Sequence, residues 1–322
     1  MSAGTVMHPD MQLIIAARTQ AGARGVATTS PAEFREYWRN YSRLFHEPCP
    51  PDMEVHDQIV QSNGLSIPVR IYRPTNAVRP CPVVMYMHGG GFVAGDLDSS
   101  ETSAWGYAAQ IGAVVVSVDY RLAPEFPYPA QLNDCWSVLQ WIPSQAGALG
   151  IDPHRIAVTG ESAGGTLSAA LALKARDQGG TAIACAAMIY PWAGPSRTAA
   201  DDPPSYREFA DSPSLSRASM QRYQENYLQN EKDFEDPLAR PAIADLAGLP
   251  PFWVHTGGMD PLRDDGRIFA AKLASAGGDV QYREAPGMLH GFMRARVKGP
   301  GVRREYDALC AFLARELGLR QR

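Results

Sequence analysis

The chain has 322 residues, of which 30 are lysine or arginine and 34 are aspartate or glutamate, so its formal net charge is -4. Neither sign of charge is strongly clustered, so the composition gives no reason to expect a nucleic acid or an anionic membrane as a partner. A chain of this length can bury a large core, as one α/β domain or as two smaller ones.

Cysteine usage and the N-terminal residues favour a cytoplasmic location. The five cysteines are odd in number and scattered, without a Cys-x-x-Cys pair, which argues against a disulfide framework and against a structural zinc site. The apolar run 11–17 is short and flanked by polar residues, so we expect neither a signal peptide nor a stable insertion into a membrane. We therefore expect a cytoplasmic protein with no bound metal.

Residues 1–50 differ from the rest of the chain and predict a separate helical segment. Ser30 and Glu33 match a capping box, and Pro31 stands at the first helical position. The predicted helix carries one aromatic stripe, made of Phe34, Tyr37, Trp38, Tyr41 and Phe45. Such a stripe can simply pack on the body of the protein, but a bulky aromatic face also suits a lid over an apolar pocket. We interpret 1–50 as an N-terminal cap segment.

Residues 51–322 show the pattern of one large α/β domain. The first two strand-like segments are joined by Asn63-Gly64, a dipeptide typical of two-residue hairpin turns. Uninterrupted apolar runs then alternate with helical segments, and these runs are 83–87, 113–118, 156–159, 182–190, 252–256 and 280–284. Such runs are typical of parallel strands that are covered on both faces. We therefore predict a mostly parallel sheet of about eight strands, flanked by helices.

One segment, at about 193–248, interrupts this alternation. It is rich in proline, serine, aspartate and arginine, and it is too long for an ordinary connection between a strand and a helix. We interpret it as a helical insertion that joins the N-terminal segment to form a cap. The substrate pocket beneath this cap is expected to be lined by bulky side chains, namely Trp38, Tyr41, Phe45, Phe92, Tyr206 and Phe209.

The pentapeptide at 160–164, Gly-Glu-Ser-Ala-Gly, lies between a short apolar run and an Ala/Leu-rich helical segment. Gly-x-Ser-x-Gly between a strand and a helix is the nucleophile elbow, a tight and strained turn that exposes the serine hydroxyl. The helix behind Ser162 directs its N-terminus at that hydroxyl, where it would stabilise an oxyanion. Taken alone, the pentapeptide is common and can also be a glycine-rich turn with an incidental serine.

A serine nucleophile needs a base, and the base needs an acid that orients it. In this fold the acid and then the histidine follow the serine, each in a loop after a strand. Of the two downstream histidines, His255 stands inside an apolar run and is better explained as a core residue, whereas His290 lies in a glycine-flanked loop after the last run. We assign His290 as the base. Asp260 is the first carboxylate after the preceding run and is preferred as the acid, while Asp264 and Asp265 are expected to begin the next helix.

The candidate oxyanion hole is the segment 88–92, His-Gly-Gly-Gly-Phe, which directly follows an apolar run. Glycines let the backbone direct its amides toward a carbonyl oxygen without obstruction by a Cβ. The candidate donors are the amides of Gly89, Gly90, Gly91 and Ala163. We prefer Gly90 and Gly91 among the glycines, although the sequence does not decide which two of the three donate. His88 is expected to hold the loop by hydrogen bonds.

Five motifs together resemble the hormone-sensitive lipase family of α/β-hydrolases, the bacterial family IV esterases. They are His-Gly-Gly-Gly-Phe at 88–92, Asp-Tyr-Arg-Leu-Ala-Pro-Glu at 119–125, Gly-Glu-Ser-Ala-Gly-Gly at 160–165, Asp-Pro-Leu-Arg-Asp at 260–264 and His-Gly-Phe at 290–292. The resemblance implies a capped α/β-hydrolase fold and a serine carboxylesterase that acts on small-molecule esters with short-to-medium acyl chains. It also implies that no cofactor is needed and that a homodimer is possible. Many members carry Asp where this chain has Glu161, and we expect only a small local adjustment.

Three other classes fit part of the sequence. Gly89, Gly91 and Gly95 follow an apolar run and Asp119 ends the next one, which partly imitates a dinucleotide-binding fingerprint. However, loop-like residues follow Gly95 where the fingerprint needs a helix, and the serine elbow is left unexplained. A binding protein on a hydrolase scaffold is disfavoured because all three triad candidates are present. An amidase or peptidase uses the same triad, so the sequence leaves that alternative open.

Overall fold

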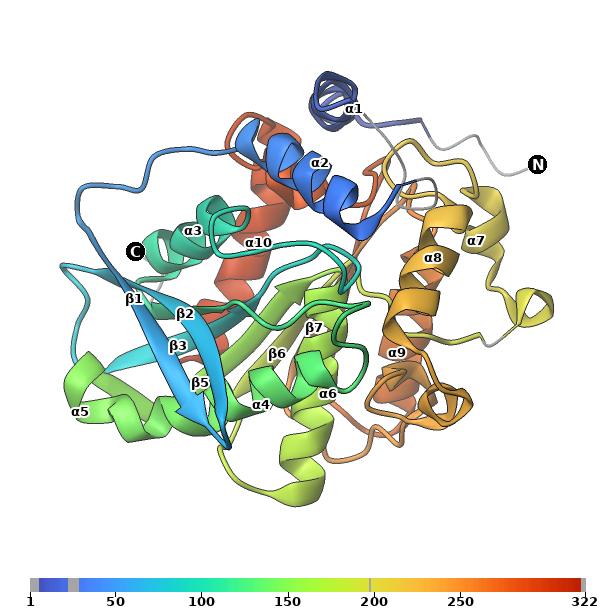
Figure 1. Cartoon of the computed structure of the whole chain (residues 1–322). Coiled ribbons are helices and arrows are strands. Elements are labelled where there is room, and N and C mark those ends of the chain that lie inside the picture. The colour runs from blue at the N-terminus through green and yellow to red at the C-terminus, as the bar shows by residue number, and fades with distance from the viewer. Residues whose placement is uncertain (1–5, 23–28, 197, 320–322) are drawn as a thin grey trace.

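An eight-stranded sheet forms the centre of the computed structural model, which describes residues 6–22, 29–196 and 198–319 (Figure 1). The strands are β1 (Met53–Ser62), β2 (Leu65–Pro74), β3 (Cys81–Met87), β4 (Val114–Val118), β5 (Ile151–Glu161), β6 (Cys185–Ile189), β7 (Phe252–Gly257) and β8 (Val280–Ala285). Their order across the sheet is β1-β2-β4-β3-β5-β6-β7-β8. β2 is antiparallel to β1 and to β4, and all other neighbours are parallel. The predicted mostly parallel sheet is therefore confirmed.

The β1–β2 hairpin closes through the predicted turn. Asn63 and Gly64 have φ angles of 50° and 77°, and a two-residue turn of this kind requires such left-handed values. Ser62 and Leu65 pair directly beside the turn. The dipeptide therefore determines the register of the hairpin.

Two strands begin three or more residues away from the start of the apolar run that predicts them, whereas the other strands begin within two residues of it. β5 begins at Ile151, well before the predicted run 156–159, and Ile151 pairs with Cys81 of β3. β6 begins at Cys185, although the predicted run begins at 182, and Cys185 lies opposite Ala157 of β5. An apolar run reports burial, whereas the ends of a strand depend on the partner with which it pairs.

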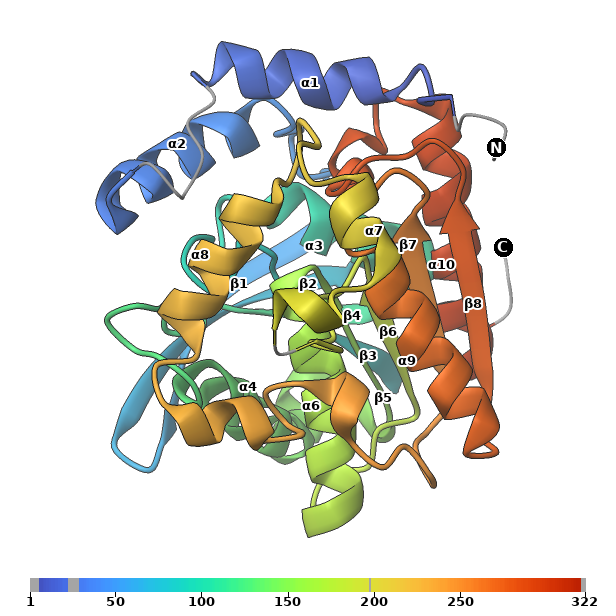
Figure 2. The same ribbon diagram turned by 90° about the vertical axis from the view of Figure 1, so that its right-hand side faces the viewer.

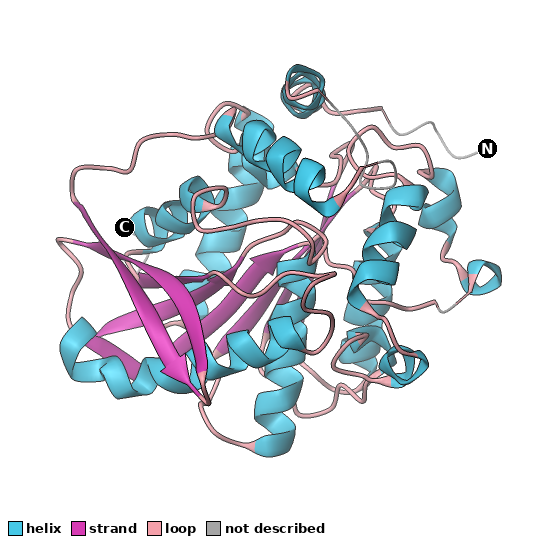
Figure 3. Cartoon of the chain, viewed as in Figure 1, coloured by secondary structure: helices cyan, strands magenta, loops and turns pink. Residues whose placement is uncertain are grey.

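Helices cover both faces of the sheet (Figure 3). One face packs against α3 (Glu101–Ile111) and α10 (Pro300–Glu316), and the other packs against α4 (Ala130–Trp141), α6 (Ala163–Gln178) and α9 (Arg263–Ser275). Successive residues of β3 alternate between the two cores: Val83 and Met85 belong to the core beneath α6, whereas Val84 and Tyr86 belong to the core beneath α10. Because both faces are buried, the strands are continuously apolar.

Several other elements of the chain are short. They are α5 (Ala146–Leu149) and the 3₁₀ helices η2 (Ile142–Gln145), η3 (Ala199–Asp201), η4 (Glu231–Glu235), η5 (Pro241–Ile243) and η6 (Phe292–Ala295). Within the part of the chain that the structure describes, every helix is too short or too polar to cross a membrane.

Helices from two distant parts of the chain lie together at one end of the sheet (Figure 2). They are α1 (Met11–Gln20) and α2 (Pro31–Arg43) from the N-terminal segment, and α7 (Pro204–Glu208) and α8 (Arg217–Tyr227) from the segment between β6 and β7. The predicted capping box begins α2, because Ser30 and Glu33 accept hydrogen bonds from each other's amides. The rings of Phe34 on α2 and Tyr223 on α8 lie 5.7 Å apart. The cap boundaries of 1–50 and about 193–248 stay a prediction.

The residues before α1 attach the N-terminal segment to the C-terminal part of the domain. Asp10 Oδ2 accepts hydrogen bonds from the amides of Gly301 and Val302, at 2.7 and 3.0 Å, in the first turn of α10. A carboxylate in this position also interacts favourably with the helix dipole. The amide of His8 donates to the carbonyl of Gly287 at 2.9 Å. The segment is therefore docked on α10 and on the loop that follows β8.

Asp265 anchors the start of the inserted segment to α9. It lies in the first turn of that helix, as predicted, and is fully buried. Its Oδ1 accepts hydrogen bonds from the amides of Ala193 and Gly194, at 2.8 and 3.3 Å. Burial, the largest effect, together with the nearby charge of Asp260 raises the pKa of Asp265 from 3.8 to about 8. The carboxyl group is therefore mostly protonated at neutral pH.

We expect Asp265→Asn to change the pH dependence of stability. Because the folded-state pKa is raised above the unfolded one, folding takes up a proton between about pH 4 and pH 8, so wild-type stability falls as the pH rises through this window and is level above it. Asparagine keeps an accepting oxygen but does not titrate. The melting temperature of the wild type relative to Asp265→Asn should therefore decrease from about pH 6 to about pH 8 and then stay level.

Asp264→Asn is the matched control for this measurement. The pKa of Asp264 is lowered from 3.8, because hydrogen bonds from Arg263 and from the Ser205 amide outweigh its burial. Its substitution should therefore change the melting temperature by an amount that is constant above about pH 6. A constant difference for Asp265→Asn as well would contradict the prediction.

Candidate active site

Ser162 lies in the turn between β5 and α6, in a strained backbone conformation. Its φ is 56° and its ψ is -114°, values that a non-glycine residue keeps only when its surroundings impose them. Gly160 and Gly164, two residues on either side of Ser162, leave no room for a side chain. A Cβ on Gly160 would lie 2.4 Å from the backbone of Gly164, and a Cβ on Gly164 would lie 2.0 Å from the carbonyl oxygen of Met87 in β3. The elbow can form only because these two side chains are absent.

Ser162, His290 and Asp260 form one chain of hydrogen bonds. His290 Nε2 lies 3.0 Å from Ser162 Oγ, and His290 Nδ1 lies 2.8 Å from Asp260 Oδ2. Asp260 is fully buried, and its other oxygen accepts a hydrogen bond from the amide of Leu262 at 2.8 Å. The carboxylate thus orients the imidazole with Nδ1 toward itself and Nε2 toward the serine hydroxyl. The structure brings together the three residues that the sequence assigned to the triad.

The loops that carry the aspartate and the histidine are joined to each other and to the cap. The amide of Met259 donates to the carbonyl of Met288 at 2.9 Å. The amide of Leu289, next to the histidine, donates to the thioether sulfur of Met11 in α1 at 3.1 Å. The position of the imidazole therefore depends on two neighbouring segments as well as on its own loop.

Two other histidines, His255 and His88, are buried and have structural surroundings. His255 is fully buried with its Nε2 3.0 Å from Glu305, and burial lowers its pKa. His88 is also buried, and burial lowers its pKa to about 4. Its Nδ1 lies 3.0 Å from the carbonyl oxygen of Gly89, and its ring stacks on Tyr120 at 4.2 Å. Both residues have the placement that the sequence predicted, in the core and in support of the glycine loop.

The glycine loop turns tightly beside the elbow. Gly90 and Gly91 have φ angles of 134° and 63°, and the carbonyl of Gly90 accepts hydrogen bonds from the amides of Val93 and Ala94 at 3.1 and 3.0 Å. A Cβ on Gly90 would lie 2.0 Å from the carbonyl oxygen of Ala94. All four predicted donors line the cavity that contains Ser162: Gly89, Gly90, Gly91 and Ala163. None of their amides donates a hydrogen bond to a described residue outside its own helix or strand, so the choice among them stays a prediction.

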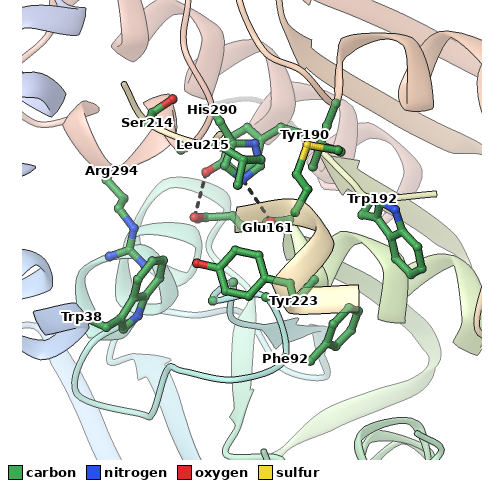
Figure 4. A pocket seen from close by; sticks show the side chains of 18 of the residues that line it. Trp38, Phe92, Glu161, Tyr190, Trp192, Ser214, Leu215, Tyr223, His290 and Arg294 are labelled. Atoms are coloured by element: carbon green, nitrogen blue, oxygen red, sulfur yellow. Dashed lines mark hydrogen bonds between the residues drawn. The ribbon is translucent and has the colours of Figure 1, made fainter. Parts of the chain in front are cut away.

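The cavity around Ser162 lies between the cap and the sheet (Figure 4). Of the predicted pocket residues, Trp38, Tyr41 and Phe92 line it. Its other walls are mostly aromatic or apolar, and the described residues that form them include Tyr190, Trp192, Leu215, Met220, Tyr223, Tyr227 and Leu262. Ser162 therefore lies beneath a largely apolar cover.

Three predicted pocket residues lie outside the cavity. Phe45 packs edge-on against Tyr41, with 5.3 Å between the ring centroids, and does not line the cavity around Ser162. Tyr206 is buried inside the cap, with the guanidinium of Arg217 5.2 Å from its ring. Phe209 lies 5.2 Å from the guanidinium of Arg263. The assignment of Phe45, Tyr206 and Phe209 to the pocket is therefore wrong, because the sequence shows where aromatic residues gather but not which of them face a cavity.

Several lining residues were missed by the sequence reasoning. Trp192 follows β6, and the carboxyl end of a parallel strand is a general position for binding residues, so that signal was available. Arg18 on α1 and Arg294 in η6 also line the cavity. Arg294 stands two residues after the motif at 290–292, but neither arginine is part of a motif. Glu161 accepts a hydrogen bond from the hydroxyl of Tyr190 at 2.8 Å and reaches the same cavity.

The fold and the arrangement of this site define an α/β-hydrolase, and comparisons with known proteins agree. The sequence profile of a family described as alpha/beta hydrolase fold matches residues 84–294. Carboxylesterase NlhH of Mycobacterium tuberculosis is 41% identical over 259 residues, which cover 78% of this chain and 79% of that protein. The chain belongs to this family, of the hormone-sensitive lipase type that its motifs predicted, and it is a hydrolase.

Two relatives extend the similarity to almost the whole chain. Ethyl acetate hydrolase of Pseudomonas putida is 32% identical over 297 residues, which cover 89% of this chain and 92% of that protein. The crystal structure of a thermostable esterase from Pseudomonas putida ECU1011 superposes with a TM-score of 0.90 at 31% identity, and it covers 99% of this chain and 100% of that one. The similarity therefore includes the cap as well as the sheet.

We expect Asp260→Asn to lower kcat by about 10⁴-fold, because an amide cannot hold the imidazole in the required tautomer. Asp265→Asn is the control, since this aspartate contacts the backbone of the inserted segment and not the imidazole. Steady-state rates and melting temperatures of both variants should be measured together. A loss of similar size in a folded Asp265→Asn protein would mean that the acid has been assigned to the wrong residue.

Proposed function

We propose that the protein is a serine carboxylesterase that hydrolyses short-to-medium acyl esters through an acyl-enzyme intermediate. One observation carries this proposal: Ser162 Oγ, on a strained elbow at the floor of an apolar cavity, lies 3.0 Å from His290 Nε2, whose other nitrogen lies 2.8 Å from the buried Asp260. A hydroxyl is a poor nucleophile at neutral pH, and this arrangement supplies the base and the orienting acid that it needs.

The first half of the reaction acylates the serine. Ser162 Oγ attacks the carbonyl carbon of the ester while its proton passes to Nε2 of His290. The resulting tetrahedral oxyanion accepts hydrogen bonds from the amide of Ala163 and from the glycine loop, preferably from Gly90 and Gly91. When the intermediate collapses, the bond to the alcohol oxygen breaks and His290 returns the proton to the leaving alcohol.

The second half releases the acid. A water molecule attacks the acyl carbon while His290 takes one of its protons, and the same amides stabilise the second oxyanion. Collapse breaks the bond to Ser162 Oγ, which recovers its proton from His290, and the carboxylic acid leaves. The cycle consumes one ester and one water, and it needs no cofactor.

The names of the relatives support an ester as the substrate, since a carboxylesterase and an ethyl acetate hydrolase are among them. The dinucleotide-binding alternative is opposed by the loop after Gly95, because the next helix, α3, begins only at Glu101. An amidase or peptidase remains the competing proposal, because it would use the same three residues. We further propose a cytoplasmic protein that can form a homodimer.

We expect p-nitrophenyl esters to be hydrolysed and the matching anilides to be spared, since an amide leaving group needs protonation more than an alkoxide does. Ser162→Ala should abolish ester hydrolysis without loss of fold, because no acyl-enzyme can form. A serine-directed organophosphonate should label Ser162 alone, as read by mass spectrometry of the intact protein and its peptides. Turnover by the folded variant, label on another residue, or faster cleavage of anilides would each refute the proposed chemistry.

Chain-length preference follows from the size of the cavity. The cavity has a volume of about 80 Å³, and two of the rings that line it, Phe92 and Tyr227, stack with 3.7 Å between their centroids. Each methylene that fits gains roughly 0.8 kcal/mol until the space is full. We therefore expect kcat/KM to rise from acetate to about butyrate or hexanoate and to fall for longer acids.

Trp38→Ala tests whether Trp38 limits the length of the acyl chain. The variant enlarges the cavity, so the optimum in a p-nitrophenyl ester series should move to longer acids. Phe209→Ala removes an aromatic ring from the cap at a position outside the cavity, and its optimum should match the wild type. Identical profiles for the wild type and Trp38→Ala would show that the N-terminal helix is packing and not a lid.

A further inference from the structure

The cavity around the candidate triad carries a guanidinium group, that of Arg294, at the end where Trp38 lies (Figure 4). Apart from the triad, the described residues that line it include one carboxylate, Glu161, and two guanidinium groups, those of Arg18 and Arg294. Their sum is one positive charge in surroundings that are otherwise largely apolar. In Figure 4, Arg294 lies beside Trp38 at one end of the cavity, and Trp192 lies at the opposite end.

The carboxylate is already engaged by neutral donors. Glu161 accepts hydrogen bonds from the hydroxyls of Tyr86 and Tyr190, at 3.2 and 2.8 Å. Within the described part of the chain, neither cavity arginine forms an ion pair within 4.0 Å. The negative charge of Glu161 therefore offsets the positive field of the cavity without occupying the donors of the arginines.

Arg294 is held in place but keeps donors for the cavity. One of its terminal nitrogens donates to Ser42 Oγ at 3.1 Å and to the carbonyl of Ser99 at 3.3 Å. The guanidinium lies 4.7 Å from the ring of Trp38. A guanidinium has five N–H groups, and those of the other two nitrogens form no hydrogen bond with a described residue. A positioned cation with open donors is suited to an anionic group of a ligand.

The guanidinium of Arg18 has fewer polar partners among the described residues than that of Arg294. Its guanidinium lies 5.8 Å from the rings of Tyr37 and of Tyr41, close to the outer limit of a cation–π contact. Its Nε is buried and has no hydrogen-bond partner within the described residues. A buried donor without a partner costs free energy, and Arg294 places a second cation 5.6 Å from the same Tyr41 ring. These two like charges therefore favour an anion between or beside them.

We propose that the end of the cavity where Arg294 lies binds a carboxylate of the substrate, so that the preferred esters carry a second, anionic carboxyl group, as in half-esters of dicarboxylic acids. This inference rests on the proposed esterase function and specifies its substrate class. Arg18 and Arg294 act as specificity-determining residues, while the aromatic end around Trp192 holds the uncharged part of the ester. The carboxylate remains unchanged in the reaction, so the hydrolytic steps are the same as for a neutral ester.

A purely structural role for the two arginines predicts something different. If they only pack against Trp38, Tyr37 and Tyr41, their removal lowers stability and slows all substrates in similar proportion. If they bind a carboxylate, their removal changes the ratio between an anionic ester and a neutral ester of the same shape. The ratio of two kcat/KM values is therefore the decisive quantity, because losses of folded protein cancel in it.

The first pair of probes places the charge on the acyl side. One is p-nitrophenyl hydrogen glutarate, and the other is p-nitrophenyl 5-methylhexanoate, in which an isopropyl group of similar shape replaces the carboxylate. Arg18→Met and Arg294→Met should each lower the anionic-to-neutral ratio by about tenfold, the scale of one charge-assisted hydrogen bond. Arg18→Lys and Arg294→Lys keep the charge and should retain a larger part of the ratio than the Met variants.

Two further variants separate the effect of charge inside the cavity from the effects of lost packing and of net charge. Glu161→Gln removes the negative charge from the cavity, so the ratio should rise, a change of sign that loss of packing does not produce. Arg304→Met makes the same change of charge on the exposed surface of α10 and should leave the ratio as in the wild type. An equal drop for Arg304→Met would attribute the effect to net charge and overturn the proposal.

A second pair of probes places the charge on the alcohol side: 4-acetoxybenzoate and 4-isopropylphenyl acetate. If the anionic-to-neutral ratio depends on the arginines in this second pair alone, the bound carboxylate belongs to the alcohol part of the ester. If it depends on them in the first pair alone, the carboxylate belongs to the acyl part. Calorimetric binding of the same four compounds to Ser162→Ala keeps the test independent of turnover. The proposal fails if neither pair shows a dependence on Arg18 or Arg294, in rates or in binding. Failure to hydrolyse any of the esters would instead refute the esterase function.

Discussion

The close contact of three backbone segments at the elbow is the constraint on which the site depends. Gly164 at the start of α6 lies against the carbonyl of Met87 in β3, and a Cβ added to Gly89 would lie 2.8 Å from the carbonyl oxygen of Glu161. Ser162 and the candidate oxyanion loop are therefore placed by contact of main chain with main chain. Such contacts leave little freedom, so the amides of this loop have fixed orientations, which is what preorganised donors require.

The cap depends on polar contacts with the body at both of its attachments. Asp10 joins the N-terminal segment to the first turn of α10 through its carboxylate. Asp265 joins the start of the inserted segment to α9. Because Met11 also contacts the amide of Leu289, the N-terminal segment touches the loop that carries His290. Packing of the cap and alignment of the imidazole are therefore physically linked.

Three buried carboxylates illustrate how surroundings decide the role of one chemical group. Asp260 is buried, faces the imidazole and accepts an amide hydrogen bond. Asp265 is buried in the first turn of α9, faces backbone amides and is held neutral by a pKa raised to about 8. Glu161 accepts hydrogen bonds from two tyrosine hydroxyls and lines the same cavity as two guanidinium groups. Burial alone does not distinguish these acids, but the groups that they face do.

The sequence by itself determined the features that arise from local patterns. Continuous apolar runs identified the parallel strands, because a sheet covered on both faces excludes polar residues, and Asn63-Gly64 identified the hairpin. Glycine spacing identified the elbow, and chain order after it identified Asp260 and His290 as partners of Ser162. Each of these inferences depends on residues that are close along the chain or on a fixed order of loops.

Only the tertiary structure decided which side chains face the cavity. Trp38 and Phe45 belong to the same aromatic stripe, yet only Trp38 lines the cavity, because the two positions on α2 and just after it meet different neighbours. Arg18 and Arg294 are far apart along the chain and approach the same tyrosine ring only when the N-terminal segment docks on the body. Long-range docking brings such charges together, and no local pattern of residues records it.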